Sequence, residues 1–461
     1  MPADTEPAAL KKLRSLCKRR GIIFQGSEIY QGFANQWDWG PLGVEICRHV
    51  RELWWNQFVR DRHDMVGLDT AIITSPKVWE ASGHLASFSD PLVECAQCHG
   101  RFPGDKLVEE ETGRDVAGHP LEEISRLIEQ NEIRCPNCGG ELGGARRFQM
   151  MFKTHVGPVE DEASAAYLRP ETAQGIFYNF ALVQQSMRMR VPFGIAQIGK
   201  AFRNEITTGN FIFRTREFEQ MEIEYFVEPG TEMKWFEHWQ EQTWEYYRRL
   251  GLSEEKMRWR EHSKEELSHY SNRTADLEYY FPWERWGEIQ GTASRTDFDL
   301  TQHQQASGQS LEYQDPMTHE KFIPYVVEPS FGVNRAVLAI LCDTYREEEV
   351  RGETRVVLGL KTDVAPCKVA VFPLSKKDKL LAISEPLFDD LRTRWPAMHD
   401  ATGSIGKRYR RHDEIGTPFC VTVDFDSIDD RKATIRHRDT MEQDRVPLDQ
   451  IAGYLEKKLA D

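Results

Sequence analysis

Residues 193–227 constrain the fold more than any other part of the sequence, because their pattern predicts two β-strands joined by a short loop. The second strand alternates apolar with polar residues, Met221, Ile223, Tyr225 and Val227 against Gln220, Glu222 and Glu224. Since strand side chains alternate between the two faces of a sheet, this pattern predicts an apolar face and a carboxylate face. Turn-forming residues at 207–210 favour an antiparallel hairpin. The carboxylates indicate the floor of an active site, although a solvated sheet face would show the same alternation.

The composition is that of an ordinary soluble protein. With 461 residues, of which 40% are hydrophobic and 29% charged, the chain can form two or three domains. No apolar run reaches the length of a membrane span, and the amino-terminal residues lack the apolar core of a signal peptide, so we expect a cytoplasmic protein. The net charge of -15 is unlike that of a duplex-binding protein, but local basic patches can still hold a shaped RNA.

Four of the nine cysteines form two close pairs, Cys95-x2-Cys98 and Cys135-x2-Cys138, inside a polar, glycine-rich region at 92–147. Four thiolates at this spacing can close a tetrahedral site, so we predict a structural zinc ion; reduced free thiols are the alternative. His99 is a possible replacement ligand. The region is poor in apolar residues, so the metal is expected to help it fold. A helix is predicted at 121–129.

Other segments have clear periodicities. Apolar spacing predicts a helix at 46–58, a strand follows at 68–75 and stops at Pro76, and residues 167–180 predict a strand end leading into a helix. Residues 228–286 show a helical aromatic stripe around Trp235, Trp239, Trp244 and Tyr247, which indicates core packing. From Pro366 onward, strands at 368–372 and 419–424 alternate with a helix at 380–395, which predicts an α/β unit with a mixed sheet.

Several motifs resemble one known family. Phe-Arg-Asn-Glu at 202–205 and Phe-Arg-Thr-Arg-Glu-Phe at 213–218 resemble motif 2 of class II aminoacyl-tRNA synthetases. The continuation at 217–224, and the stretch at 167–180, are similar to those of glycyl-tRNA synthetases. Residues 43–76 resemble motif 1, the dimer interface of the family, and residues 326–342 resemble motif 3. Ser330 stands where motif 3 normally has its first glycine, a departure that is usual for glycyl enzymes.

The resemblance implies an α+β protein. It predicts a class II catalytic domain at 1–365, built on an antiparallel sheet flanked by helices, with a zinc-binding insertion at 92–147 and a helical insertion at 228–286. It also predicts an α/β anticodon-binding domain with a mixed sheet at 366–461. The basic run Lys407-Arg408-Tyr409-Arg410-Arg411 would contact an RNA backbone and an unstacked base there, although a solvated charge run is the alternative.

The implied reaction activates glycine with ATP and then transfers it to the terminal ribose of tRNA(Gly). By resemblance, Arg203 would bind the α-phosphate, Arg214 the γ-phosphate, and Glu288 a magnesium ion. Phe218 and Arg335 would stack on the two faces of adenine, and Glu205 would accept a hydrogen bond from its amino group. The full predicted ATP site is Arg203, Asn204, Glu205, Phe213, Arg214, Phe218, Glu288, Ile289, Gly332 and Arg335, with Arg203, Glu288 and Arg335 as catalytic residues.

For glycine, the resemblance implies that Glu171, Glu222, Glu328 and Ser330 surround the ammonium group. The full predicted substrate site is Arg101, Glu171, Phe218, Gln220, Glu222, Arg295, Glu328, Ser330 and Gly332. Glycine has no side chain to recognise, so the pocket must leave no space at the α-carbon. The expected partners are ATP with Mg²⁺, glycine, tRNA(Gly) and a second copy of the chain, without DNA or a membrane.

Two rival interpretations remain. One is a synthetase-like accessory subunit of a nucleic-acid polymerase that has lost its chemistry. The presence of all the expected catalytic positions disfavours it, namely Arg203, Glu205, Arg214, Glu288 and Arg335. The other is a related class II enzyme specific for threonine or proline.

Overall fold

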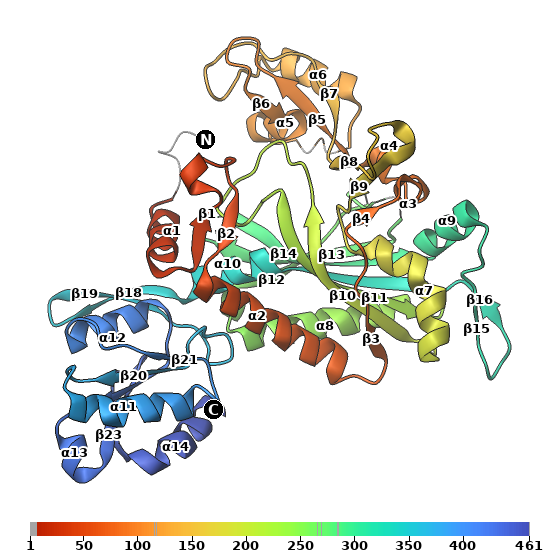
Figure 1. Ribbon diagram of the computed structural model, residues 1–461. Coiled ribbons are helices and arrows are strands. Elements are labelled where there is room, and N and C mark those ends of the chain that lie inside the picture. The colour runs from red at the N-terminus through yellow and green to blue at the C-terminus, as the bar shows by residue number, and fades with distance from the viewer. Residues whose placement is uncertain are drawn as a thin grey trace.

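The computed structural model describes residues 7–460 apart from 115, 117, 265, 269 and 284. A large central sheet is the core of the molecule (Figure 1). Its strands follow the order β12–β13–β14–β17–β11–β10–β3, with bounds β3 Met65–Gly67, β10 Phe193–Phe202, β11 Glu217–Val227, β12 Met257–Glu261, β13 Arg273–Phe281, β14 Arg285–Thr296 and β17 Tyr325–Gly332. All neighbouring strands are antiparallel except β10 and β3, which run parallel.

The predicted hairpin is confirmed, because β10 pairs with β11 along its whole length. The apolar side chains of β11 pack into the main core against α2 (Pro41–Trp55), α8 (Glu232–Leu250) and α10 (Val333–Thr344). On the opposite face, α7 (Ala173–Met187) and α9 (Phe298–Ser307) cover one end of the sheet through a second apolar cluster. The carboxylates of β11 lie on this second face, beside the covered end. The hairpin therefore supplies both the core and the floor of a polar cavity.

The prediction of one strand at 68–75 is wrong. The chain instead forms β3 in the central sheet and β4 (Ile73–Thr74) in a separate sheet with β9 (Ala165–Leu168) and β8 (Lys153–His155). Between them, the carbonyl group of Thr70 accepts a hydrogen bond of 2.7 Å from the side chain of Arg169. A side chain thus supplies the hydrogen bond that a neighbouring strand would otherwise give to this backbone carbonyl group. Pro76 begins α3 (Pro76–Ala81), where its missing N–H costs nothing.

The helical prediction for 228–286 holds only for α8. Beyond this helix, β12 and β13 and the start of β14 extend the central sheet. In β13, Ala275, Leu277, Tyr279 and Phe281 alternate into the main core, a two-residue period that marks a strand. The aromatic residues of α8 do pack in the core, as Trp239 and Tyr247 are fully buried.

The cysteine-rich insertion forms a lobe of its own above the sheet (Figure 1). It contains the sheet β6–β5–β7, with β5 Ser89–Glu94, β6 Arg101–Pro103 and β7 Arg146–Gln149, and the helices α5 (Gly104–Thr112) and α6 (Leu121–Gln130). The predicted helix at 121–129 is confirmed. However, the lobe has more of a core than its composition suggested, because α5, α6 and β5 bury a cluster that includes Val93, Leu107 and Ile128.

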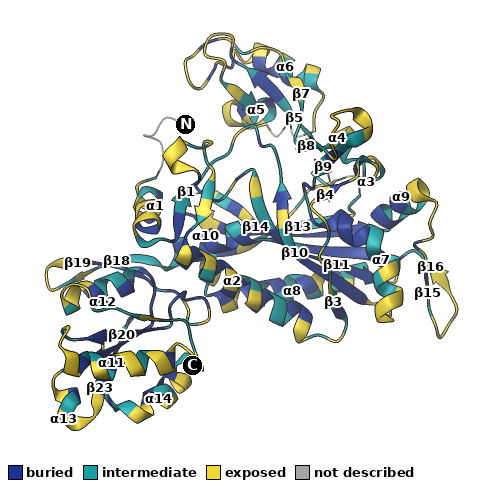
Figure 2. Cartoon of the chain, in the orientation of Figure 1, coloured by how far each residue is buried: buried dark blue, intermediate teal, exposed yellow. Residues whose placement is uncertain are grey.

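The carboxy-terminal unit is an α/β domain with a mixed sheet, as predicted. Its strand order is β21–β20–β22–β23–β24, of which β21, β20 and β22 are parallel. The elements are β20 Val369–Pro373, α11 Asp378–Leu391, β21 Ala397–His399, α12 Ile405–Glu414, β22 Phe419–Val423, α13 Asp426–Asp430, β23 Lys432–His437, β24 Gln443–Pro447 and α14 Ile451–Ala460. Figure 2 shows its buried strands between helices with exposed outer faces.

Smaller elements connect these units. They are α1 Ala8–Arg20, β1 Ile23–Gln25, β2 Trp37–Trp39, α4 His84–Ser87, β15 Tyr313–Gln314, β16 Lys321–Phe322, β18 Tyr345–Val350 and β19 Glu353–Leu358, with short 3-10 turns at Glu28–Tyr30, Glu162–Ser164, Glu254–Lys256 and Leu448–Gln450 and a π turn at Asn56–Arg60. Within the described part of the chain, no helix combines the length and apolar character that crossing a bilayer requires.

Candidate active site

A cavity of about 330 Å³ opens on the polar face of the central sheet. Strands β11, β14 and β17 form its floor, and the loop after β10 forms one wall. It is lined by most of the residues predicted from the sequence: Glu171, Arg203, Glu205, Phe213, Arg214, Phe218, Gln220, Glu222, Glu288, Ile289, Arg295, Glu328, Ser330, Gly332 and Arg335. Segments that are far apart in the chain therefore meet as the resemblance implied.

Two predicted residues do not line this cavity. Arg101 lies on β6 of the insertion, where it is exposed and its Nε donates to Glu94 at 3.0 Å. Pairing of β6 with β5 holds it in that lobe, so the prediction that Arg101 binds substrate is not supported by its position. Asn204 lines a neighbouring cavity instead, and its backbone N–H donates to the carbonyl group of Met150 at 2.7 Å.

One end of the cavity is rich in arginine. The guanidinium of Arg203 lies 5.4 Å from the ring centres of Phe88 and Phe218, and its Nε donates to the carbonyl group of Pro170 at 3.0 Å. Arg335 lies over Phe213 at 4.7 Å and pairs with Glu288 at 2.9 Å. These contacts hold two permanently charged groups in fixed planes, an arrangement suited to phosphate oxygens and to a flat base.

Asp276 is a second carboxylate near Glu288, and sequence reasoning missed it. Asp276 on β13 accepts from His262 at 2.7 Å. Asp276 and Glu288 lie together over Gly291, where a β-carbon would be 3.5 Å from the first and 3.7 Å from the second. Burial and the neighbouring Glu288 raise the pKa of Asp276 to about 6, while His262 opposes the shift. Burial acts to raise the pKa of Glu288, but Arg335 and Arg203 hold it below its usual range. The two neighbouring carboxyl groups offer the oxygen ligands that a divalent cation prefers. The alternation of β13 was the signal that could have located Asp276.

The other end of the cavity is crowded with carboxylates around a single arginine. Arg295 donates to both oxygens of Asp299, at 2.8 and 2.9 Å, and to Glu328 at 2.9 Å. Glu222 accepts from Ser330 at 2.7 Å and from Thr172. The three glutamates of this end, Glu222, Glu224 and Glu328, each place a carboxylate oxygen within 4.8 Å of the others.

Glu171 has a histidine and a glutamine as further partners. Its carboxylate lies 3.2 Å from Nε2 of His84 and accepts from Gln174 at 3.1 Å. Burial would raise the pKa of Glu171, but His84, Arg295 and Gln174 together lower it well below its usual range. Sequence reasoning missed both residues. His84 belongs to none of the recognised motifs, and only the fold brings it to Glu171, whereas Gln174 is three residues from Glu171 at the start of α7.

The remaining carboxyl groups are short of positive charge. Burial raises the pKa of Glu328 to about 8, with Glu222 and Glu171 adding to the shift and Arg295 opposing it. Burial and Glu171 also raise the pKa of Glu222. Buried carboxylates of this kind gain stability from any cation that enters. This end of the cavity is therefore built to receive a small, positively charged ligand.

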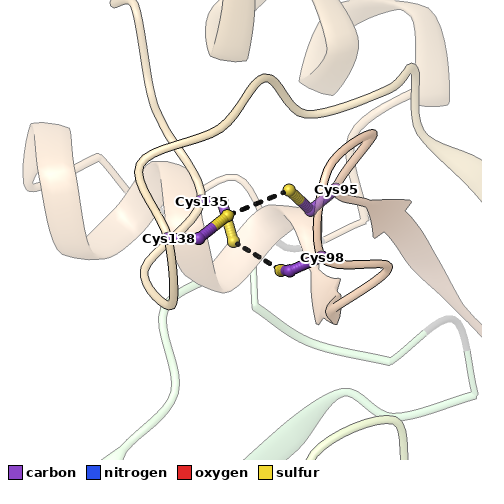
Figure 3. Close-up of side chains that lie close together, drawn as sticks. All are labelled: Cys95, Cys98, Cys135 and Cys138. Atoms are coloured by element: carbon purple, nitrogen blue, oxygen red, sulfur yellow. Dashed lines mark hydrogen bonds between the residues drawn. The ribbon is translucent and has the colours of Figure 1, made fainter.

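The four predicted metal ligands come together in the insertion (Figure 3). Cys95 Sγ lies 3.5 Å from Cys138 Sγ, and Cys98 Sγ lies 3.6 Å from Cys135 Sγ. All four sulfur atoms lie within 4.8 Å of one another. His99 does not belong to this group; its ring is exposed and lies 3.5 Å from Glu94.

The basic run on α12 is only partly available to a ligand. Arg408 is buried and donates to several backbone carbonyl groups, including that of Pro373 at 2.5 Å. Arg411 pairs with Asp400. Lys407 and Arg410 line a surface groove together with Tyr409 and Arg411. The interpretation of the whole run as one contact surface is therefore wrong for Arg408, which stabilises the domain.

Comparison with known proteins identifies both main units. Residues 152–344 match the family model described as "tRNA synthetase class II core domain (G, H, P, S and T)", and residues 368–458 match the one described as "Anticodon binding domain". A solved prolyl-tRNA synthetase from Cryptosporidium parvum superposes with a TM-score of 0.66 at 14% identity, covering 100% of this chain and 79% of its own. This likeness confirms the predicted fold class.

Two relatives narrow the family further. The glycine-tRNA ligase of Caldanaerobacter subterraneus subsp. tengcongensis is 54% identical over 456 residues, which cover 98% of both chains. That of Streptomyces coelicolor is 54% identical over 454 residues, covering 96% of this chain and 97% of its own. Because such identity extends over almost the whole length, the chain belongs to the glycine-tRNA ligase family of the class II synthetases.

Proposed function

We propose that the cavity on the central sheet is where this chain carries out the first step of its family's reaction, joining glycine to ATP as glycyl-adenylate. One observation carries this assignment. A single cavity has an arginine-rich end that suits a triphosphate and a carboxylate-rich end that suits an ammonium group. In the second step the amino acid passes to the terminal ribose of tRNA.

The first step needs no protein nucleophile. The carboxylate of glycine attacks the α-phosphorus, and pyrophosphate leaves, so catalysis consists of alignment and neutralisation of charge on phosphate oxygens. We assign the α-phosphate to Arg203 and the γ-phosphate to Arg214, whose guanidinium lies 3.5 Å from Glu205. Bound Mg²⁺ would neutralise the phosphates as a Lewis acid. Glu288 is the expected ligand, and Asp276 is the second carboxylate that the fold provides.

The adenine would lie between Phe218 and Arg335, with Glu205 accepting from its amino group. Without nucleotide, Arg203 lies over Phe218 and Arg335 lies over Phe213. Both aromatic rings therefore already have a planar cation beside them, which supports the proposal that a flat base can stack there. Ile289 and Gly332 line the same part of the cavity.

At the other end, Glu171, Glu222 and Glu328 would surround the ammonium group of glycine. The charge of the ligand supplies the cation that this end lacks. Ser330 and Gln220 complete the wall, since Gln220 donates to Ser330 at 3.3 Å and Ser330 donates to Glu222. Pyrophosphate exchange tests these assignments, because label enters ATP only when glycyl-adenylate forms.

We propose that the four cysteines hold one structural zinc ion. Zn–S distances of about 2.3 Å in a tetrahedron place sulfur atoms roughly 3.8 Å apart, close to the distances between the Sγ atoms here. Elemental analysis should find about one zinc per chain, and Cys135→Ser should lose most of it and destabilise the insertion before exchange is affected. The matched control His99→Ala should keep its zinc. A fully active preparation without metal would contradict the proposal.

We also propose that the protein is a homodimer, as the motif 1 resemblance implies, and that it acts in the cytoplasm, where tRNA is charged. Large apolar side chains are exposed near α2, including Ile29, Tyr30 and Phe33 at 86%, 82% and 77% and Val44 on the helix itself at 45%. Phe33 and Val44 line one apolar groove. Analytical ultracentrifugation should give twice the mass of one chain, and Val44→Arg should shift it toward the monomer.

Leu182→Arg is the matched control for the dimer, because Leu182 is also an exposed apolar residue on a helix, at 66%, but lies on α7. It should leave the mass unchanged. A monomeric wild-type protein would refute the dimer, and an equal effect of both variants would place the interface elsewhere.

A further inference from the structure

Glu224 on β11 is a buried acidic residue that the reaction as described does not use. Its exposed fraction is 0%, and neither of its carboxylate oxygens has a hydrogen-bond partner among the described residues. It lies two residues after Glu222 and so points to the same face of the sheet. The register pairs Glu222 with Ser330 and Tyr225 with Val327, which brings Glu224 opposite Glu328 on β17.

Among the described residues, the charged groups with the largest effect on Glu224 include one cation, and that cation is already paired. They are Glu222 on the same strand, Glu328 on β17, Asp299 on α9 and Arg295 on β14. Arg295 is the one cation among them, and its guanidinium is already engaged by Asp299 through Nε and Nη2 and by Glu328 through Nη1. An ionised Glu224 would therefore be a buried charge opposite another carboxylate, an arrangement that proteins avoid.

A neutral Glu224 resolves this conflict. A protonated carboxyl group has one O–H donor, whereas an ionised one can only accept. Glu328 has a carboxylate oxygen within 4.8 Å that can accept. Two carboxyl groups that face each other at close range commonly share one proton, because both cannot be ionised.

We propose that Glu224 remains protonated and that its hydroxyl donates to Glu328, so that Glu224 is a positioning residue for the carboxylate that receives the ammonium group. This inference rests on the proposed role of Glu328 in binding glycine. Burial, together with Glu328 and Glu222, raises the pKa of Glu224 well above its usual range, while Arg295 opposes the shift. The proton stays on Glu224 when glycine binds, and no bond is made or broken.

Two substitutions separate this role from a direct charge interaction with the ligand. Glu224→Gln keeps the volume, the neutrality and a donor, so the glycine KM should stay within about threefold of wild type. Glu224→Met keeps the volume but loses the donor. Its glycine KM should rise by about tenfold, the effect of one hydrogen bond, with an unchanged ATP KM. The Met variant should remain folded, because it replaces an unpartnered polar group with an apolar one.

Infrared spectroscopy reads the protonation state independently of activity. With glycine bound, so that the ammonium group keeps Glu328 ionised, wild-type protein should show the C=O stretch of a buried protonated carboxylic acid at neutral pH, and this band should be absent from Glu224→Gln. Absence of the band in wild type, or a Gln variant as impaired as Glu328→Ala, would overturn the proposal. If Glu328→Ala leaves the glycine KM unchanged, the assignment of the glycine site fails instead, while the band still reports whether Glu224 holds its proton.

Discussion

Glycine-dependent pyrophosphate exchange should fall by about 10²–10³-fold or more when Arg203 or Arg335 is replaced by alanine. Both arginines line the cavity, where fixed positive groups would match the charge on the phosphate oxygens. Loss of one such donor removes interactions that strengthen as the α-phosphorus is attacked. Both the exchange rate and the ATP KM should be measured.

The fold should survive these substitutions. Arg203 and Arg335 are only partly buried, and their protein contacts are hydrogen bonds to backbone, one ion pair and aromatic faces. Arg258→Ala is a matched control, because Arg258 also stacks on an aromatic ring, Trp286 at 4.2 Å, and pairs with Glu278, but it lies outside the cavity. It should exchange normally. Near-normal exchange by either cavity variant, with an unchanged thermal melt, would contradict the assignment of the ATP site.

Local patterns in the sequence predicted the centre of the molecule well. The alternation in β11 depends on each residue and its neighbours alone, and the structure confirms both faces of that strand. The hairpin itself was predicted from the same local pattern. The positions of other cavity residues, such as Glu328 on the strand before α10, were predicted from the resemblance of their short motifs to those of a known family.

The predictions from the sequence that were wrong or incomplete depend on contacts between segments that are distant in the chain. At Thr70 the side chain of Arg169 takes the place of a neighbouring strand as hydrogen-bond donor. The pattern of residues 68–75 cannot predict this contact, because Arg169 is distant in the sequence. The basic run on α12 shows the same limit, since sequence cannot tell which guanidinium will turn inward, as Arg408 does. His84 reaches Glu171 because the chain folds back before the insertion, and Asp276 belongs to a strand hidden in a segment expected to be helical. The sequence gives the chemical type of each residue but not the residue that it contacts in the folded protein.

The second large effect is expected on glycine binding. Glycine has no side chain, so only its ammonium and carboxylate groups can be recognised. Since one methylene is worth only about 1–3 kcal/mol, a pocket that merely tolerates alanine would discriminate poorly. The pocket must be rigid and full. Glu328 meets both needs, as Arg295 fixes its carboxylate at 2.9 Å and its side chain is only 12% exposed. It can accept from the ammonium group while occupying the volume into which the methyl group of alanine would project.

Glu328→Ala should therefore raise the glycine KM by about 10- to 150-fold, the effect of losing a charge-assisted hydrogen bond, and leave the ATP KM nearly unchanged. Arg295 keeps both bonds to Asp299, so the site should stay folded. Glu328→Gln separates charge from volume. It should also weaken glycine binding but still exclude alanine, whereas the alanine variant should gain activity with alanine relative to glycine. Exchange kinetics with both amino acids decide the matter, and an unchanged glycine KM in Glu328→Ala would mean that this carboxylate lies outside the pocket.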